Sequence, residues 1–141
     1  MFSRTLKLSS IPLNNDLGLL LLRVLVCLNL FIKHGWEKLF DFNGVVALVP
    51  DILHIGVPLT IALALIGDSI CSVLIMLGLA TRWACMYSFA VIFVAMIWKN
   101  HFLYLGHNGD HVELMLLYLS ALLAIFIMGP GRYSLDVRFK D

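Results

Sequence analysis

The chain has 141 residues, of which 61% are hydrophobic and 13% are charged, and its formal net charge is +1. Soluble domains carry about 25% charged residues, so this composition excludes an ordinary soluble domain and indicates one membrane-embedded domain. A near-neutral balance without a basic cluster excludes nucleic acid as a partner. The three cysteines are widely spaced and form no CxxC pair, which argues against a thiol–disulfide relay or a thiolate zinc site.

The first apolar run, from Leu17 to Phe40, predicts a membrane-spanning helix. It follows a polar segment at residues 1–16, in which Asn14, Asn15 or Asp16 supplies the N-cap. We expect this helix to be retained in the protein, because no small-residue cleavage signal precedes it.

Polar side chains interrupt this first helix along one stripe. At about 100° per residue, Arg23, Cys27, His34 and Lys38 fall within an arc of roughly 60°. Lipid does not tolerate such a stripe, so it must face protein or water. The first helix therefore predicts partner helices whose polar groups meet it.

The rest of the chain contains three more apolar runs. Residues 41–55, broken by Gly44 and Pro50, are too short to span and predict a surface loop or a re-entrant turn. Helices are expected at 56–80, with a proline in the first turn, at 83–99 after a tight turn at 81–82, and at 111–128. Asp110 and Glu113 resemble a capping box before the last helix.

Four apolar runs with short connections predict an all-α, integral membrane, up-down-up-down four-helix bundle at residues 17–128. Arginine and lysine concentrate near the termini and the second connection, so the positive-inside rule makes residues 1–16 and 129–141 cytoplasmic. That orientation gathers all five histidines in the outer half of the protein: His34, His54, His101, His107 and His111.

Several short motifs resemble the DoxX family of membrane proteins. They are an arginine in the first helix, HGWEKLF ending at Phe40, an acidic residue in the second helix before LGLATR, and GPGRYSLD ending at Asp136. The resemblance extends from about Leu17 to Asp136. Many relatives have glutamate where this chain has the shorter Asp68.

The resemblance implies a four-helix protein of the bacterial cytoplasmic (inner) membrane. Some members of the family are associated with quinone-linked sulfur oxidation or with oxidative-stress complexes, and most have no assigned activity. Quinone is therefore the cofactor that the resemblance suggests, with a membrane or soluble redox protein as the partner.

Charged groups at membrane depth cost about 2.5–3.5 kcal/mol each on insertion scales, so Arg23 and Asp68 need an explanation. We expect Arg23 to lean toward the cytoplasmic surface. His34 leans the opposite way, toward Asp68, with Cys27 between them. Such a couple can exchange protons, and the alternative is a hydrogen bond that only fastens two helices.

We assign proton exchange to His34 and Asp68. Ligand binding is assigned to Arg23, Cys27, Lys38, His101 and Glu113, with Lys38 or Glu113 orienting the head of the ligand. The histidines at 101, 107 and 111 match no familiar ligand spacing, so we expect no metal.

Two functions remain open at this stage. The chain is either a component of a quinone-linked membrane oxidoreductase with a polar pocket open to the outer side, or a non-catalytic accessory or assembly protein for a partner complex. No redox-cofactor motif is present, so electrons would come from a partner. Small residues on helix faces such as Gly67 and Gly78 do not decide whether the chain forms a homo-oligomer.

Overall fold

The computed structural model describes residues 14–103 and 110–139, and its regular structure there is entirely helical. One long helical stretch consists of α1 (Asn15–Leu30), the π-helical turn η2 (Phe31–Gly35) and α2 (Trp36–Phe40). After α3 (Phe42–Leu48), a second stretch consists of α4 (Val57–Leu65), η3 (Ile66–Ile70) and α5 (Cys71–Leu77). The chain continues through α6 (Thr81–Leu103), α7 (Asp110–Met128) and the short α8 (Leu135–Arg138).

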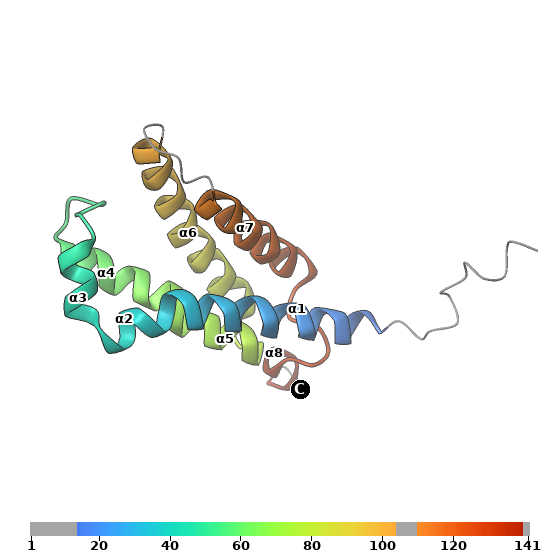
Figure 1. Cartoon of the computed structure of the whole chain (residues 1–141). Helices are drawn as coiled ribbons and strands as arrows, with labels where there is room; N and C mark the ends of the chain where they lie inside the picture. The colour runs from blue at the N-terminus through green and yellow to red at the C-terminus, as the bar shows by residue number, and fades with distance from the viewer. Residues whose placement is uncertain (1–13, 104–109, 140–141) are drawn as a thin grey trace, which may run out of the picture.

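The helices pack as two pairs. The first pair joins α1 to α5, the second joins α6 to α7, and further contacts run from α5 to α6 and from α1 to α7. Figure 1 shows the two pairs crossing at an angle. The start of α1 and α8 lie at one end of the molecule, here called the α8 end, and α2 and α3 lie at the other, here called the α3 end.

Three helical stretches are long and apolar enough to cross a membrane: Asn15–Phe40, Val57–Leu77 and Thr81–Trp98. A fourth apolar helix, Val112–Met128, is shorter. The predicted all-helical membrane protein is thus confirmed. Residues 1–13 and 104–109, with the expected N-terminal segment and His107, lie outside the described residues.

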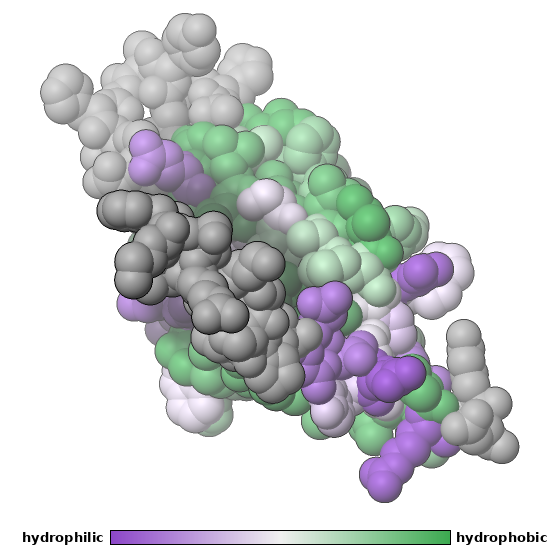
Figure 2. All heavy atoms as spheres, turned by 90° about the vertical axis from the view of Figure 1, so that its right-hand side faces the viewer, coloured by the Kyte–Doolittle hydropathy of each residue, from purple (hydrophilic) through white to green (hydrophobic). Residues whose placement is uncertain are grey.

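The exposed and buried surfaces are inverted relative to a soluble protein. Arg23 is completely buried and Asp68 is 5% exposed, whereas Leu25 is 61% exposed and Ile127 is 67% exposed. Figure 2 shows hydrophobic residues over a continuous area of one face, beside a gathering of hydrophilic residues. This distribution suits helices whose outer faces touch lipid.

Helix ends follow local chemistry. The Asn14 side chain accepts a hydrogen bond from the Asp16 N–H and caps α1, as predicted, and a proline occupies the first turn of α4, also as predicted. The expected turn at Thr81 is wrong, because α6 begins there. The Asp136 carboxylate accepts from the N–H groups of Ala80 (2.7 Å) and Thr81 (2.9 Å), which satisfies donors at the start of α6.

The segment at 41–55 is more regular than the expected loop. It contains α3, whose first turn is capped by Asp41 through a hydrogen bond from the Gly44 N–H (3.2 Å). Sequence periodicity could not reveal a helix of seven residues, because so short a segment spans barely two turns.

Both long stretches are interrupted by π-helical turns that contact each other, η2 against η3. The Trp36 N–H bonds the Phe31 carbonyl, and the Cys71 N–H bonds the Ile66 carbonyl, each five residues back. Such insertions are rare and frequently occur at functional sites. Here they carry His34 and Asp68 toward the same region of the molecule.

Gly35 permits the close approach of the two π-helical turns. A Cβ atom on Gly35 would lie 2.6 Å from the Ser69 hydroxyl oxygen and 2.9 Å from the Asp68 carbonyl oxygen. Gly18, on the same long stretch, would meet nothing within 4 Å. The contact between η2 and η3 therefore requires a residue without a side chain at position 35.

We predict that Gly35→Ala destabilises the protein by about 1–3 kcal/mol, because the added methyl group forces the two turns apart. Gly18→Ala should stay within about 0.5 kcal/mol of the wild type, since its methyl group enters open space. Reversible unfolding of the purified protein in detergent measures both changes. Equal stabilities of the two variants would contradict the role given to Gly35.

Candidate ligand-binding cavity

A partly open cavity of about 640 Å³ lies toward the α3 end of the molecule. Its walls come from the α1–α2 stretch, from α4 and η3, and from α6 and α7, and residues 45–53 complete it. The volume falls in the usual range for small-molecule sites, roughly 300–1,000 Å³. Most lining side chains are apolar, and the polar or amphipathic ones are His34, Glu37, Lys38, Thr60, Asp68, Tyr87, Trp98 and Tyr118.

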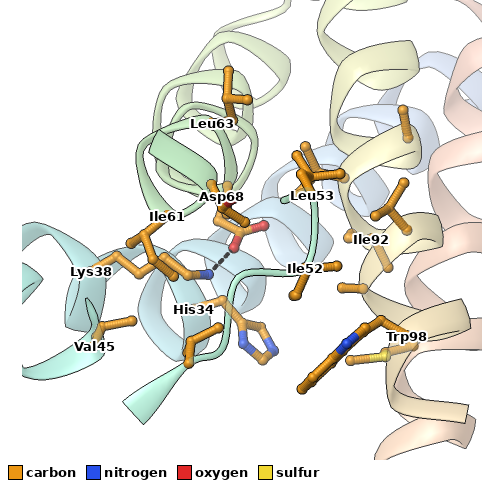
Figure 3. Close-up of a pocket in the computed structure, with 18 of the residues that line it drawn as sticks. His34, Lys38, Val45, Ile52, Leu53, Ile61, Leu63, Asp68, Ile92 and Trp98 are labelled. Atoms are coloured by element: carbon orange, nitrogen blue, oxygen red, sulfur yellow. Dashed lines mark hydrogen bonds and ion pairs between the residues drawn. The ribbon is translucent and has the colours of Figure 1, made fainter. Parts of the chain in front are cut away.

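Lys38 and Asp68 form an ion pair in this cavity, drawn as a dashed line in Figure 3. The side chain of Lys38 is 17% exposed and that of Asp68 is 7% exposed. The pair joins α2 to η3 across the two helical stretches. A nearly buried carboxylate thus has its countercharge beside it, as the cost of burying an isolated charge requires.

His34 lies beside this pair, with its imidazole pointing into the cavity (Figure 3). Its ring meets the Tyr118 ring of α7 edge-on, at a centroid distance of 6.2 Å and an interplanar angle of 81°. The structure therefore brings together three of the predicted site residues, His34, Lys38 and Asp68. The ion pair of Asp68 with Lys38 was not predicted from the sequence.

Arg23 lies elsewhere. It is completely buried toward the α8 end, does not line the cavity, and donates a hydrogen bond from Nη2 to the Tyr133 carbonyl oxygen (2.9 Å). Arg23 thus lies toward the α8 end, but its guanidinium group does not reach the surface, because the segment after α7 folds over it. Gly78, at φ +71°, leaves room for that group, since a Cβ there would meet both Arg23 and Ser134.

The remaining predicted ligand residues are dispersed. Cys27 is completely buried and does not line the cavity, and Glu113 is exposed and does not line it either. The backbone of His101 belongs to α6, but its side chain lies outside the described part of the structure, as does the capping geometry expected for Asp110. Among the described residues, no cluster of three or more metal-ligating side chains occurs.

Sequence reasoning missed two aromatic residues of the cavity, Tyr87 and Tyr118. The Tyr87 hydroxyl donates to the Leu63 carbonyl oxygen (3.1 Å) and thereby links α6 to α4. Tyr118 is 6% exposed in the core of α7. Both are tyrosines in the middle of apolar helices, and the sequence shows this. Because the hydroxyl group of a buried tyrosine usually forms a hydrogen bond, that position could have indicated a polar site.

The segment between α3 and α4 covers one side of the cavity, with Ile52 and Leu53 directed into it (Figure 3). Asp51 holds this segment to the start of α4. Its carboxylate accepts hydrogen bonds from the N–H groups of Ile55 (3.3 Å) and Gly56 (2.7 Å) and from the Thr60 hydroxyl (3.1 Å).

These contacts also set the acidity of Asp51. Desolvation on its own would raise the pKa of the Asp51 carboxyl, but the hydrogen bonds from Gly56, Thr60 and Ile55, with a smaller contribution from the charge of His54, hold it below its usual value. The ionised carboxylate is therefore the form that fastens the segment.

The fold and the cavity define the class: an all-helical membrane protein with an ion pair in a largely apolar site. The DoxX family model matches residues 18–101, more than half of the chain, and the protein belongs to the DoxX family. That match contains the helices that carry His34, Lys38 and Asp68. A search of curated proteins returns no match, and neither does a search of solved structures.

We predict that the segment 49–56 loosens in acid. Because the folded-state pKa of Asp51 lies below the ordinary value of about 3.9, its stabilisation is present above that value and is lost as the pH falls through the folded-state pKa. Hydrogen exchange at Gly56 should show wild-type protection exceeding that of Asp51→Asn at neutral pH. The difference should vanish in acid, and a difference independent of pH would contradict this account.

Proposed function

We propose that this DoxX protein binds the head of a quinone in the cavity and serves as a component of a quinone-linked oxidoreductase system of the bacterial inner membrane. The observation that carries the proposal is the Lys38–Asp68 ion pair, with His34 beside it, in a largely apolar cavity of about 640 Å³. A quinone needs this combination: apolar walls for its ring, a hydrogen-bond donor for its carbonyl oxygen, and groups that exchange protons.

The proposal includes four membrane crossings with both ends of the chain cytoplasmic. The apolar helix Val112–Met128 extends about 26 Å at 1.5 Å per residue, close to the roughly 30 Å of a hydrocarbon core. It packs against both α6 and α1. Three arginines lie at the α8 end: Arg82 in the first turn of α6, Arg132 between α7 and α8, and Arg138 at the end of α8. They favour that end as cytoplasmic. The cavity then lies in the outer half of the membrane.

Asp68, His34 and Lys38 have separate roles in the proposed reaction. Reduction of a quinone to a quinol takes up two electrons and two protons. The electrons come from a redox partner protein, and the protons pass through Asp68 and His34, since a carboxylate and an imidazole can each accept and release a proton. The Lys38 ammonium group donates a hydrogen bond to a carbonyl oxygen, an interaction that strengthens as the oxygen gains negative charge.

We expect Asp68→Asn to weaken binding of a short-tailed benzoquinone by about tenfold or more, as loss of a charge-assisted hydrogen-bond network would. The fold should be retained, because the amide keeps the shape and its oxygen can still accept from Lys38, whose ammonium group borders a partly open cavity. Equilibrium binding to protein in lipid nanodiscs, measured at neutral pH, provides the test.

Glu113→Gln is the matched control, because it removes a carboxylate that is exposed and outside the cavity lining. Its quinone binding should equal that of the wild type. If Asp68→Asn binds the benzoquinone as the wild type does, the proposed site is wrong. If the wild type binds none, the protein is better described as a non-catalytic accessory to a partner complex.

A further inference from the structure

The cavity continues along one stripe of α6 that reaches the outer surface of the protein. Seven residues of this helix line the cavity: Tyr87, Ala90, Val91, Ile92, Val94, Ala95 and Trp98. All of them except Ile92 recur at the three- and four-residue spacing of one helical face. Two of them, Ala90 and Val94, are also exposed, the latter by 39%. Ala90 and Val94 thus belong both to the cavity wall and to the protein surface.

The opposite border of this opening belongs to α4. Leu63 lines the cavity, and its carbonyl oxygen receives the Tyr87 hydroxyl, while the Ser88 hydroxyl donates to the Gly67 carbonyl oxygen (2.8 Å). These two hydrogen bonds fasten α6 to the α4–η3 stretch. Leu63, Ala90 and Val94 therefore border an opening between two helices that are tied together beside it.

This opening lies at the depth of the membrane. Val94 is about 20 Å along α6 from Thr81 at 1.5 Å per residue, inside a span of about 30 Å. The neighbouring outward side chains are apolar and exposed: Leu59 by 52%, Ile66 by 38% and Ile97 by 50%. A molecule that meets this surface comes from the hydrocarbon core.

The side of the cavity next to the α3–α4 connection is covered differently. Ile52 and Leu53 are directed into the cavity (Figure 3), and the Asp51 hydrogen bonds hold their segment to the start of α4. A ligand entering from that side would have to displace this segment. An approach between α4 and α6 displaces none of these contacts.

We propose that the ligand is dissolved in the bilayer and enters sideways, through the opening that Leu63, Ala90 and Val94 border. This inference rests on the proposed quinone site and names the class of its substrate, a water-insoluble quinone with a prenyl tail. The head reaches Lys38 and Asp68, and the tail lies between α4 and α6 and continues into the lipid. Val94 and Ala90 thus determine specificity for the tail.

The test compares two probes on the full chain in lipid nanodiscs. One is an isoprenoid-tailed ubiquinone added with the lipid, and the other is the tail-less dimethoxy-methyl-benzoquinone added from water. Val94→Trp should weaken binding of the tailed quinone by about tenfold, equivalent to about 1.4 kcal/mol, and leave the tail-less probe unchanged. Ile97→Trp adds the same group to α6 outside the cavity lining and should leave both affinities unchanged.

Two results would overturn the sideways entry. In one, Val94→Trp binds the tailed quinone as the wild type does. In the other, it loses both probes equally, which would place Val94 at the head of the ligand. Ala90→Phe repeats the test if Val94→Trp does not fold. Wild-type protein that binds only the tail-less probe contradicts the sideways entry alone, whereas binding of neither probe contradicts the quinone site as well.

Discussion

The contact between η2 and η3 is the constraint on which the rest of the structure depends. Gly35 brings the backbone of one π-helical turn against Asp68 and Ser69 of the other. Each π-helical turn contains one residue more than the same length of α-helix. Without these inserted residues, α2 would be rotated about its axis relative to α1, and α5 relative to α4. The insertions therefore allow each stretch to pack at the α8 end and still direct a polar group into the cavity.

The π-helical turn η3 changes the hydrogen bonding of the Gly67 carbonyl group. Because the Cys71 N–H bonds the Ile66 carbonyl, it no longer serves the carbonyl of Gly67, and the Ser88 hydroxyl of α6 donates to that oxygen instead. Within a hydrocarbon environment, a backbone carbonyl needs a protein partner. The π-helical turn and the attachment of α6 thus depend on one another. A Cβ atom at Gly67 would also approach the Val91 side chain to 2.9 Å, which indicates how closely α6 packs there.

Much of the fold could be predicted from the sequence because membrane helices are long and their apolar composition is unambiguous. The stripe through Arg23 and Cys27 was also informative, since both side chains are completely buried. The π-helical turns could not be predicted, because one inserted residue leaves the apolar composition unchanged. The family resemblance is confirmed, while four crossings and the orientation of the ends remain proposals.

The candidate site was predicted less completely. His34 and Asp68 were expected to lie close together, and both do line the cavity, but Lys38 forms the ion pair. Lys38 follows His34 by four residues and shares its face, so the spacing alone could not show that Lys38 would pair with Asp68. Arg23 shows a different limit: its acceptor is the Tyr133 carbonyl, far away in sequence, and periodicity within one helix carries no information about such a partner.

The ion pair itself argues for a role beyond stability. Burying two opposite charges costs more desolvation energy than an apolar pair of similar volume, so buried ion pairs are weak contributors to stability. In this protein, other polar groups already connect the helices at lower cost, such as the Ser88 and Tyr87 hydroxyl groups. Lys38 and Asp68 moreover line the cavity, where a ligand can replace the solvation that each charge loses. The position of this charge pair therefore supports the proposed binding role of Lys38 and Asp68.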